Sequence, residues 1–137
     1  TKFIADFMGA TNIFSGKVTG KNNGAVQLET EEGIRLLALK REDVDTEDIT
    51  GACVHPEKVD VVPTATQVEA DNAFGGTITS MIYQGDFVEI QVRLKDTKKG
   101  KIITAHLDAR QSSESGLAVG KEVLTHWDLE SSKTFQG

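Results

Sequence analysis

The feature that most constrains the fold is a pattern that occurs twice in the chain. Asn12-Ile13-Phe14-Ser15-Gly16-Lys17-Val18 and Asn72-Ala73-Phe74-Gly75-Gly76-Thr77-Ile78 place Asn, Phe, Gly and a β-branched aliphatic residue at the same spacing, 60 residues apart. Alternate residues of a strand share a face, so the Phe and the aliphatic residue point inward together. The Gly between them allows a bulge or a sharp bend. A repeated strand that bends at a fixed point predicts two small barrels.

The segments that follow each copy predict more strands and no long helix. Asn23-Gly24 is the residue pair that most favours a tight hairpin, and the Pro at position 56 interrupts any central strand. Alternation of apolar and polar residues predicts strands over 13–19, 25–30, 34–39, 77–84, 87–94, 101–107 and 121–127, with a loop over 112–116 and a short edge strand over 133–135. We therefore expect an all-β chain with two OB-like small barrel lobes built from the internal repeat. These lobes cover residues 1–62 and 72–137, and a connector covers 63–71.

Composition restricts the classes of partner and compartment. The chain has 137 residues, 38% of them hydrophobic and 6% aromatic, so two lobes would each have a thin core that needs support from a partner. The net charge of -6 argues against nucleic-acid binding, and the strand over 87–94 offers only Phe87 and Arg93 for stacking and phosphate contacts. The single cysteine, Cys53, excludes an internal disulfide and fits a reducing compartment. No run of apolar residues is long enough to insert into a membrane.

Several sequence patterns resemble a phosphate-binding, metal or catalytic site but lack residues that such a site needs. The segment 116–122 resembles a phosphate-binding loop, but its glycines are one residue too close and Glu122 replaces the hydroxyl that holds magnesium. Cys53 and His55 supply only two of the four ligands of a structural zinc site. The pairs His106-Leu107-Asp108 and His126-Trp127-Asp128 have no nucleophile at a motif spacing. We therefore expect no catalytic, cofactor or metal site, and no enzyme activity, in this chain.

The motifs, taken in order, resemble a known regulatory region. Ala5-Asp6-Phe7-Met8-Gly9-Ala10-Thr11-Asn12, with Gly16 and Val18, is similar to the start of the region that follows the nucleotide-binding domain in ATP-binding subunits of bacterial ABC importers. His55-Pro56-Glu57-Lys58-Val59, Tyr83-Gln84-Gly85, and Gly120 with Trp127-Asp128 resemble later motifs of that family. The family is the transport-associated OB (TOBE) domain, and the spermidine/putrescine type is the most similar. His55 replaces the usual Arg, and Gly51-Ala52-Cys53-Val54 lacks the usual Gly-Asp lead.

The resemblance implies a non-catalytic regulatory and dimerisation domain of a polyamine-type importer. The expected partners are a second copy of the subunit, its own N-terminal nucleotide-binding domain and the importer's membrane subunits. ATP and magnesium would bind in the nucleotide-binding domain and not in this chain. The expected location is cytoplasmic, peripheral at the inner face of the cell membrane through the transporter complex.

Five residues are candidates for a dimer or regulatory surface. Tyr83, beside Gly85, and Trp127 each combine an apolar body with one polar group, a combination that is enriched at interfaces. His55 and Glu57 flank the Pro56 turn and would form a polar rim. Trp127 could equally fill the core of its own barrel. The alternative function is a small-ligand module that senses an oxyanion or the transported solute, because backbone N–H groups in turns can bind anions and the net charge of -6 suits a cationic polyamine.

Overall fold

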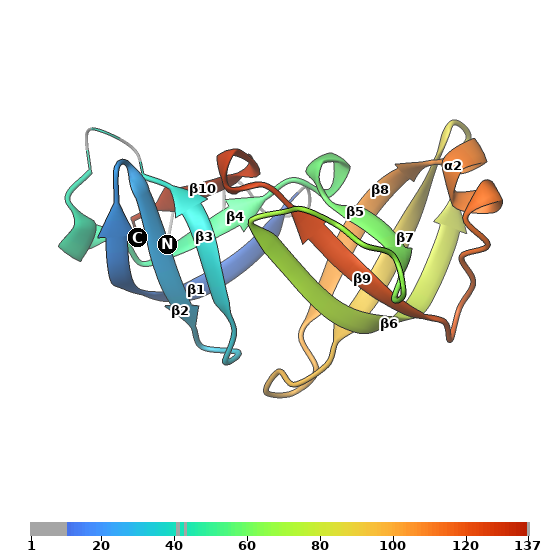
Figure 1. The fold of residues 1–137 in the computed structure, drawn as a ribbon, viewed down its shortest axis with the longest axis horizontal. Coiled ribbons are helices and arrows are strands. Elements are labelled where there is room, and N and C mark those ends of the chain that lie inside the picture. Colours follow the sequence, from blue (N-terminus) through green and yellow to red (C-terminus); the bar gives the residue numbers. More distant parts are fainter. Residues whose placement is uncertain (1–10, 41, 43, 137) are drawn as a thin grey trace.

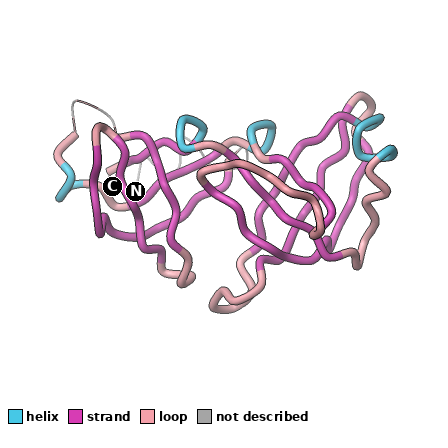
Figure 2. Tube along the Cα trace, viewed as in Figure 1, coloured by secondary structure: helices cyan, strands magenta, loops and turns pink. Residues whose placement is uncertain are grey.

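The computed structural model describes residues 11–40, 42 and 44–136, and these residues form two lobes made almost entirely of β-strands (Figures 1 and 2). The first lobe is a closed five-stranded barrel in the order β1-β2-β3-β10-β4. The second lobe is a curled five-stranded sheet in the order β5-β9-β6-β7-β8. The predicted all-β fold class is confirmed. The Ala5–Ala10 part of the family resemblance lies outside the described residues.

The first lobe contains β1 (Asn12–Asn22), β2 (Ala25–Thr30), β3 (Arg35–Leu39), β4 (Gly51–Val54) and β10 (Ser132–Phe135). The second lobe contains β5 (Asp60–Pro63), β6 (Asn72–Tyr83), β7 (Phe87–Leu94), β8 (Ile102–Asp108) and β9 (Glu122–Trp127). In the described part of the chain, four short helices connect these strands: the 3-10 turns η1 (Thr46–Asp48), η2 (Pro56–Lys58) and η3 (Leu129–Ser131), and α2 (Ala109–Glu114).

The repeated pattern marks equivalent positions in the two lobes. Each copy begins the long strand of its lobe, β1 or β6. The register shifts between Val18 and Gly20 in β1 and between Ile78 and Ser80 in β6, so the two strands bend at the same offset of 60 residues. A Cβ atom at Gly16 or Gly76 would lie within 3.0 Å of backbone in the neighbouring strand. The glycine of the repeat is therefore needed for the close approach of two strands.

The two lobes exchange one strand each. β4 of the first barrel continues through η2 into β5, which pairs with β9 of the second lobe. β9 continues through η3 into β10, which lies between β4 and β3 of the first barrel. The prediction that residues 133–135 form an edge strand was wrong, because β10 has a neighbour on both sides. The exchange also crosses the lobe boundaries expected from the sequence, since β5 pairs with the second lobe and β10 with the first.

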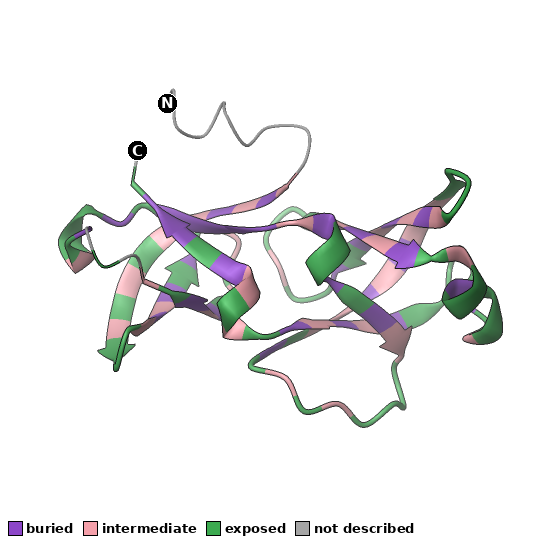
Figure 3. Cartoon of the chain, turned by 90° about the horizontal axis from the view of Figure 1, so that it is seen from above, coloured by how far each residue is buried: buried purple, intermediate pink, exposed green. Residues whose placement is uncertain are grey.

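A shared hydrophobic core joins the lobes. The ring of Trp127 lies 6.1 Å from that of Phe14 and 5.5 Å from that of Phe74, measured between centroids. The buried residues of both lobes form one continuous cluster, and their alternation with exposed residues is visible along the strands (Figure 3). We expected a separate thin core in each lobe. The indole at the seam connects the two cores instead.

Local sequence signals explain the remaining geometry. Asn23 and Gly24 have φ of 48° and 87°, which is the backbone that a two-residue hairpin between β1 and β2 requires. Where we expected a loop over 112–116, the structure has the helix α2. The side chain of Asp108 caps this helix by accepting a hydrogen bond from Gln111 N at 3.1 Å. A good N-cap stabilises even a short helix.

Candidate functional site

The two asparagines of the repeat hold the lobes together reciprocally. Asn12 of β1 donates to Thr104 O at 2.8 Å and accepts from Thr104 N at 2.7 Å, in β8 of the second lobe. Asn72 of β6 donates to Leu37 O at 2.9 Å and accepts from Leu37 N at 2.8 Å, in β3 of the first lobe. Each side-chain amide thus forms hydrogen bonds with both the N–H and the C=O of one residue in a strand of the other lobe. We name this arrangement of Asn12, Thr104, Asn72 and Leu37 the asparagine clamp.

Two lysines of the β7–β8 hairpin add contacts across the seam. Lys101 Nζ donates to Ile13 O at 2.7 Å and lies 5.0 Å above the ring of Phe14, a cation–π contact. Lys98 N donates to Glu32 O at 2.9 Å, in the turn between β2 and β3. Together with the strand exchange and the asparagine clamp, these contacts make the lobes one unit.

Trp127 belongs to the interior of this unit. It is 2% exposed, and its Nε1 donates to Ser132 Oγ at the start of β10. Of the two roles considered for this residue, the structure therefore supports core packing. Trp127 cannot lie on an exposed surface of the folded chain.

The other four candidates lie in two separate turns. His55 directly precedes η2 and Glu57 lies within it, and η2 packs against β8. Tyr83 ends β6 and is 63% exposed, and Gly85 has a φ of 85° in the turn that follows. This second turn lies beside α2, because Ala109 N donates to Asp86 O at 3.0 Å. The five candidates therefore do not form one continuous surface.

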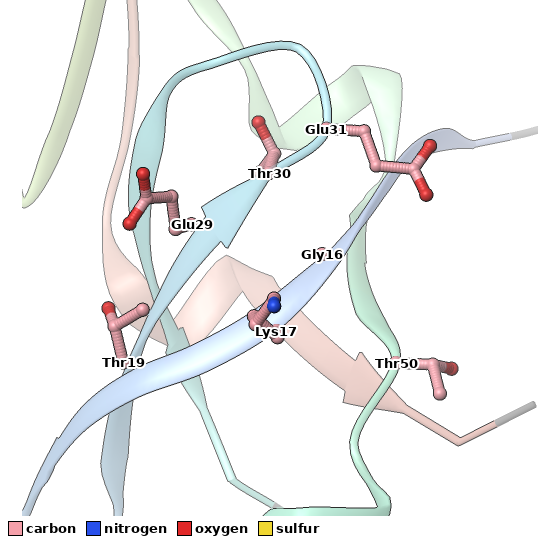
Figure 4. Close-up of a pocket in the computed structure, with 7 residues that line it drawn as sticks. All are labelled: Gly16, Lys17, Thr19, Glu29, Thr30, Glu31 and Thr50. Carbon is pink, nitrogen blue, oxygen red and sulfur yellow. The ribbon is translucent and has the colours of Figure 1, made fainter.

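A cavity of about 720 Å³ opens on the first barrel. It is lined by three threonines, by Lys17, Glu29 and Glu31, and by Gly16, whose N donates to Thr50 O at 2.9 Å. The two carboxylates point to opposite sides of the cavity (Figure 4). The site therefore offers one ammonium group and two separated carboxylates to a small ligand. Of the residues that line this cavity, only Gly16 of the repeat, where β1 comes close to β2, was singled out from the sequence.

Titratable groups elsewhere are dispersed. His106 Nε2 lies 3.1 Å from Glu89 Oε1, and the His106 ring contacts the ring of Phe87 in a tilted arrangement, with centroids 4.6 Å apart. Burial raises the pKa of the Cys53 thiol. Within residues 11–40, 42 and 44–136, no three His, Cys, Asp or Glu side chains come close enough to hold a metal ion. Nor does that part of the chain contain a helix long and apolar enough to cross a membrane.

The sequence matches the model of the TOBE domain family over residues 52–135. The chain belongs to the TOBE domain family. TOBE domains are non-catalytic. The match includes the strand exchange, because it begins in β4 and ends with β10.

The curated relatives of this TOBE domain are ATP-binding proteins named for spermidine/putrescine import. PotA of Trichormus variabilis is 32% identical over 98 residues, which cover 69% of this chain and 25% of that protein. PotA of Trichodesmium erythraeum is 34% identical over 98 residues, which cover 67% and 26%. PotA of Nitrosomonas europaea is 28% identical over 137 residues, which cover 96% and 36%. The chain thus spans about a quarter of the length of the first two relatives.

A solved structure shares the whole fold. The cytoplasmic molybdate-binding protein ModG, in a molybdate-bound form, superposes with a TM-score of 0.80. The alignment covers 95% of this chain and 99% of ModG at 17% sequence identity. The two-lobed architecture of this TOBE domain is therefore that of a known molybdate-binding protein.

Proposed function

We propose that this TOBE domain is the regulatory and dimerisation domain of a polyamine-type ABC importer ATP-binding subunit. In that setting it acts at the inner face of the cell membrane, beside the nucleotide-binding domain of its own subunit and the importer's membrane subunits. ATP and magnesium bind to the nucleotide-binding domain, and this domain keeps two subunits together. The observation that carries the proposal is the family match, supported by relatives that are named as spermidine/putrescine import ATP-binding proteins.

The strand exchange between the lobes is consistent with a domain that holds two subunits together. A domain that holds two subunits while other parts open and close must transmit force without coming apart. The exchanged strands and the asparagine clamp would have to break before the lobes could separate. A lasting contact between two such domains raises the effective concentration of the attached subunits, so their reassociation becomes intramolecular.

We expect the chain to form a dimer on its own at micromolar concentrations. Sedimentation velocity over a concentration series measures this directly, because the dimer fraction rises with concentration. A chain that stays monomeric at the highest concentration reached would contradict the tethering role.

The second candidate function is small-ligand sensing at the cavity of the first barrel. Two observations favour it: the ModG-like fold and the charged groups that line the cavity. An oxyanion would contact Lys17, whereas a polyamine would contact Glu29 and Glu31. Either ligand would meet the threonine hydroxyls at Thr19 and Thr50.

Calorimetric titration separates the two kinds of ligand. If the cavity takes an oxyanion, molybdate or sulfate binds saturably and Lys17→Ala abolishes the heat. If it takes a polyamine, spermidine binds and a Glu29→Gln/Glu31→Gln variant abolishes the heat. Lys133→Ala, an exposed lysine on β10, serves as the control in both titrations. No saturable heat with any of the three ligands would remove sensing from the functions of this domain.

A further inference from the structure

The second half of β6 has one open edge. β9 leaves β6 at Ile78, whose N donates to Lys121 O at 3.0 Å and whose O accepts from Gly120 N at 2.8 Å. β6 then continues to Tyr83, paired only with β7 in the described part of the chain. Gln84 N donates to Phe87 O, toward β7. Backbone groups alternate in direction along a strand, so Met81 and Tyr83 point their N–H and C=O groups away from β7.

Exposed apolar side chains gather around this edge. Five large hydrophobic residues are exposed among the described residues, and three of them lie here. Ile82 is 48% exposed and Tyr83 is 63% exposed, both on the open part of β6. Val119, which is 62% exposed, directly precedes the Gly120 that bonds to Ile78. Unpaired strand edges that carry apolar side chains tend to pair with another strand.

The first lobe provides an internal comparison. β1 bends at the equivalent bulge and also extends beyond its neighbour β4. At the offset of 60 residues, Met81, Ile82 and Tyr83 correspond to Lys21, Asn22 and Asn23. All three residues of the first lobe are polar and exposed, and lysine is a residue that protects edges from pairing. Met81 packs against the hydrophobic core, but Ile82 and Tyr83 are exposed, so their apolar character needs another explanation.

We propose that the open edge of β6, residues 79–83, is the contact through which two copies of this chain dimerise. The inference rests on the proposed tethering function and names the surface that performs it. Identical antiparallel strands can pair across a twofold axis, which makes a self-complementary contact. An axis at Met81 sets Thr79 opposite Tyr83 and Ser80 opposite Ile82, and each Met81 exchanges hydrogen bonds with its counterpart.

Charge also favours a second copy as the occupant. Each chain carries a net charge of -6, so two copies repel each other overall. Residues 79–83 contain no charged side chain, so this pairing brings no like charges together. Burying Ile82, Tyr83 and Val119 against the second copy adds apolar contact area around the paired strands.

The test transfers the first lobe's polar residues to the second lobe. In an Ile82→Asn/Tyr83→Asn variant, both changed residues are exposed, so the core is untouched. We expect the dimer dissociation constant, measured by sedimentation velocity, to rise about ten-fold or more. A Leu39→Asn/Ile102→Asn variant is the matched control, because it removes two exposed hydrophobic residues away from this edge. The control should keep the wild-type constant.

Amide hydrogen exchange supplies a second measurement that side-chain packing alone would not change. Strand pairing should slow exchange of the Met81 and Tyr83 amides as protein concentration rises. Two results would contradict the β6 contact but not the tethering function. One is a wild-type dimer whose dissociation constant is unchanged in Ile82→Asn/Tyr83→Asn. The other is a dimer in which the Met81 and Tyr83 amides exchange equally fast at all protein concentrations. A wild-type chain that never dimerises would overturn both the β6 contact and the tethering function.

Discussion

Asn12 and Asn72 each connect the two lobes through a single side chain. Each is almost fully buried, and each amide satisfies both an N–H and a C=O of a strand in the opposite lobe. The sequence identified them as repeated residues, but the contacts they make lie 92 and 35 residues away along the chain. Sequence spacing predicts local structure, and it carries no information about a partner so distant.

Asn72→Ala should lower the free energy of unfolding by about 2–6 kcal/mol, because Leu37 N–H and C=O would both lose their partner, at about 1–3 kcal/mol for each group left unsatisfied. Urea denaturation followed by the fluorescence of Trp127 measures this. Asn22→Ala, at the exposed end of β1, is the control and should stay close to wild type. If Asn72→Ala lowers the free energy of unfolding as little as Asn22→Ala does, water has replaced the Asn72 side-chain amide as the partner of Leu37.

At the scale of elements, the bend in β1 and β6 depends on glycine at one position. The repeat predicted both bends, because Gly between two inward-facing residues permits close approach. It could not predict that β10 closes the first barrel. The four residues of β10 carry no signal for which sheet they join, and pairing with a distant strand is decided by the packing of the whole chain. The helix α2 was missed because its cap, Asp108, looked like part of a histidine motif.

Gly16→Ala should cost about 1–3 kcal/mol or more, the range for overpacking, because its Cβ would lie within 3.0 Å of the backbone of Glu29 and Thr30. Gly20→Ala is the matched control in the same strand. Its Cβ would have no heavy atom closer than 3.5 Å, the Oε1 of Gln27. Thermal unfolding of both variants by circular dichroism compares the two costs. Equal midpoints would show that β1 can move away from β2 without a penalty.

At the scale of the whole molecule, the sequence predicted the fold class and the repeat, but it did not predict which strands belong to each lobe. Tyr83, a candidate for the dimer surface, is 63% exposed. Trp127 was given two roles, and its position between Phe14 and Phe74 supports the interior one. Both residues are aromatic with a polar group, so residue type alone could not separate them.

The position of β10 has a consequence for how the chain is made. A ribosome releases β1, β2, β3 and β4 long before it releases residues 132–135, yet the first barrel closes only when β10 enters between β3 and β4. Until then, the edges of β3 and β4 that pair with β10 are exposed, and they can pair with strands of other molecules. Among the described strands, the one translated last is thus the one that completes the first barrel, so the two lobes finish folding together.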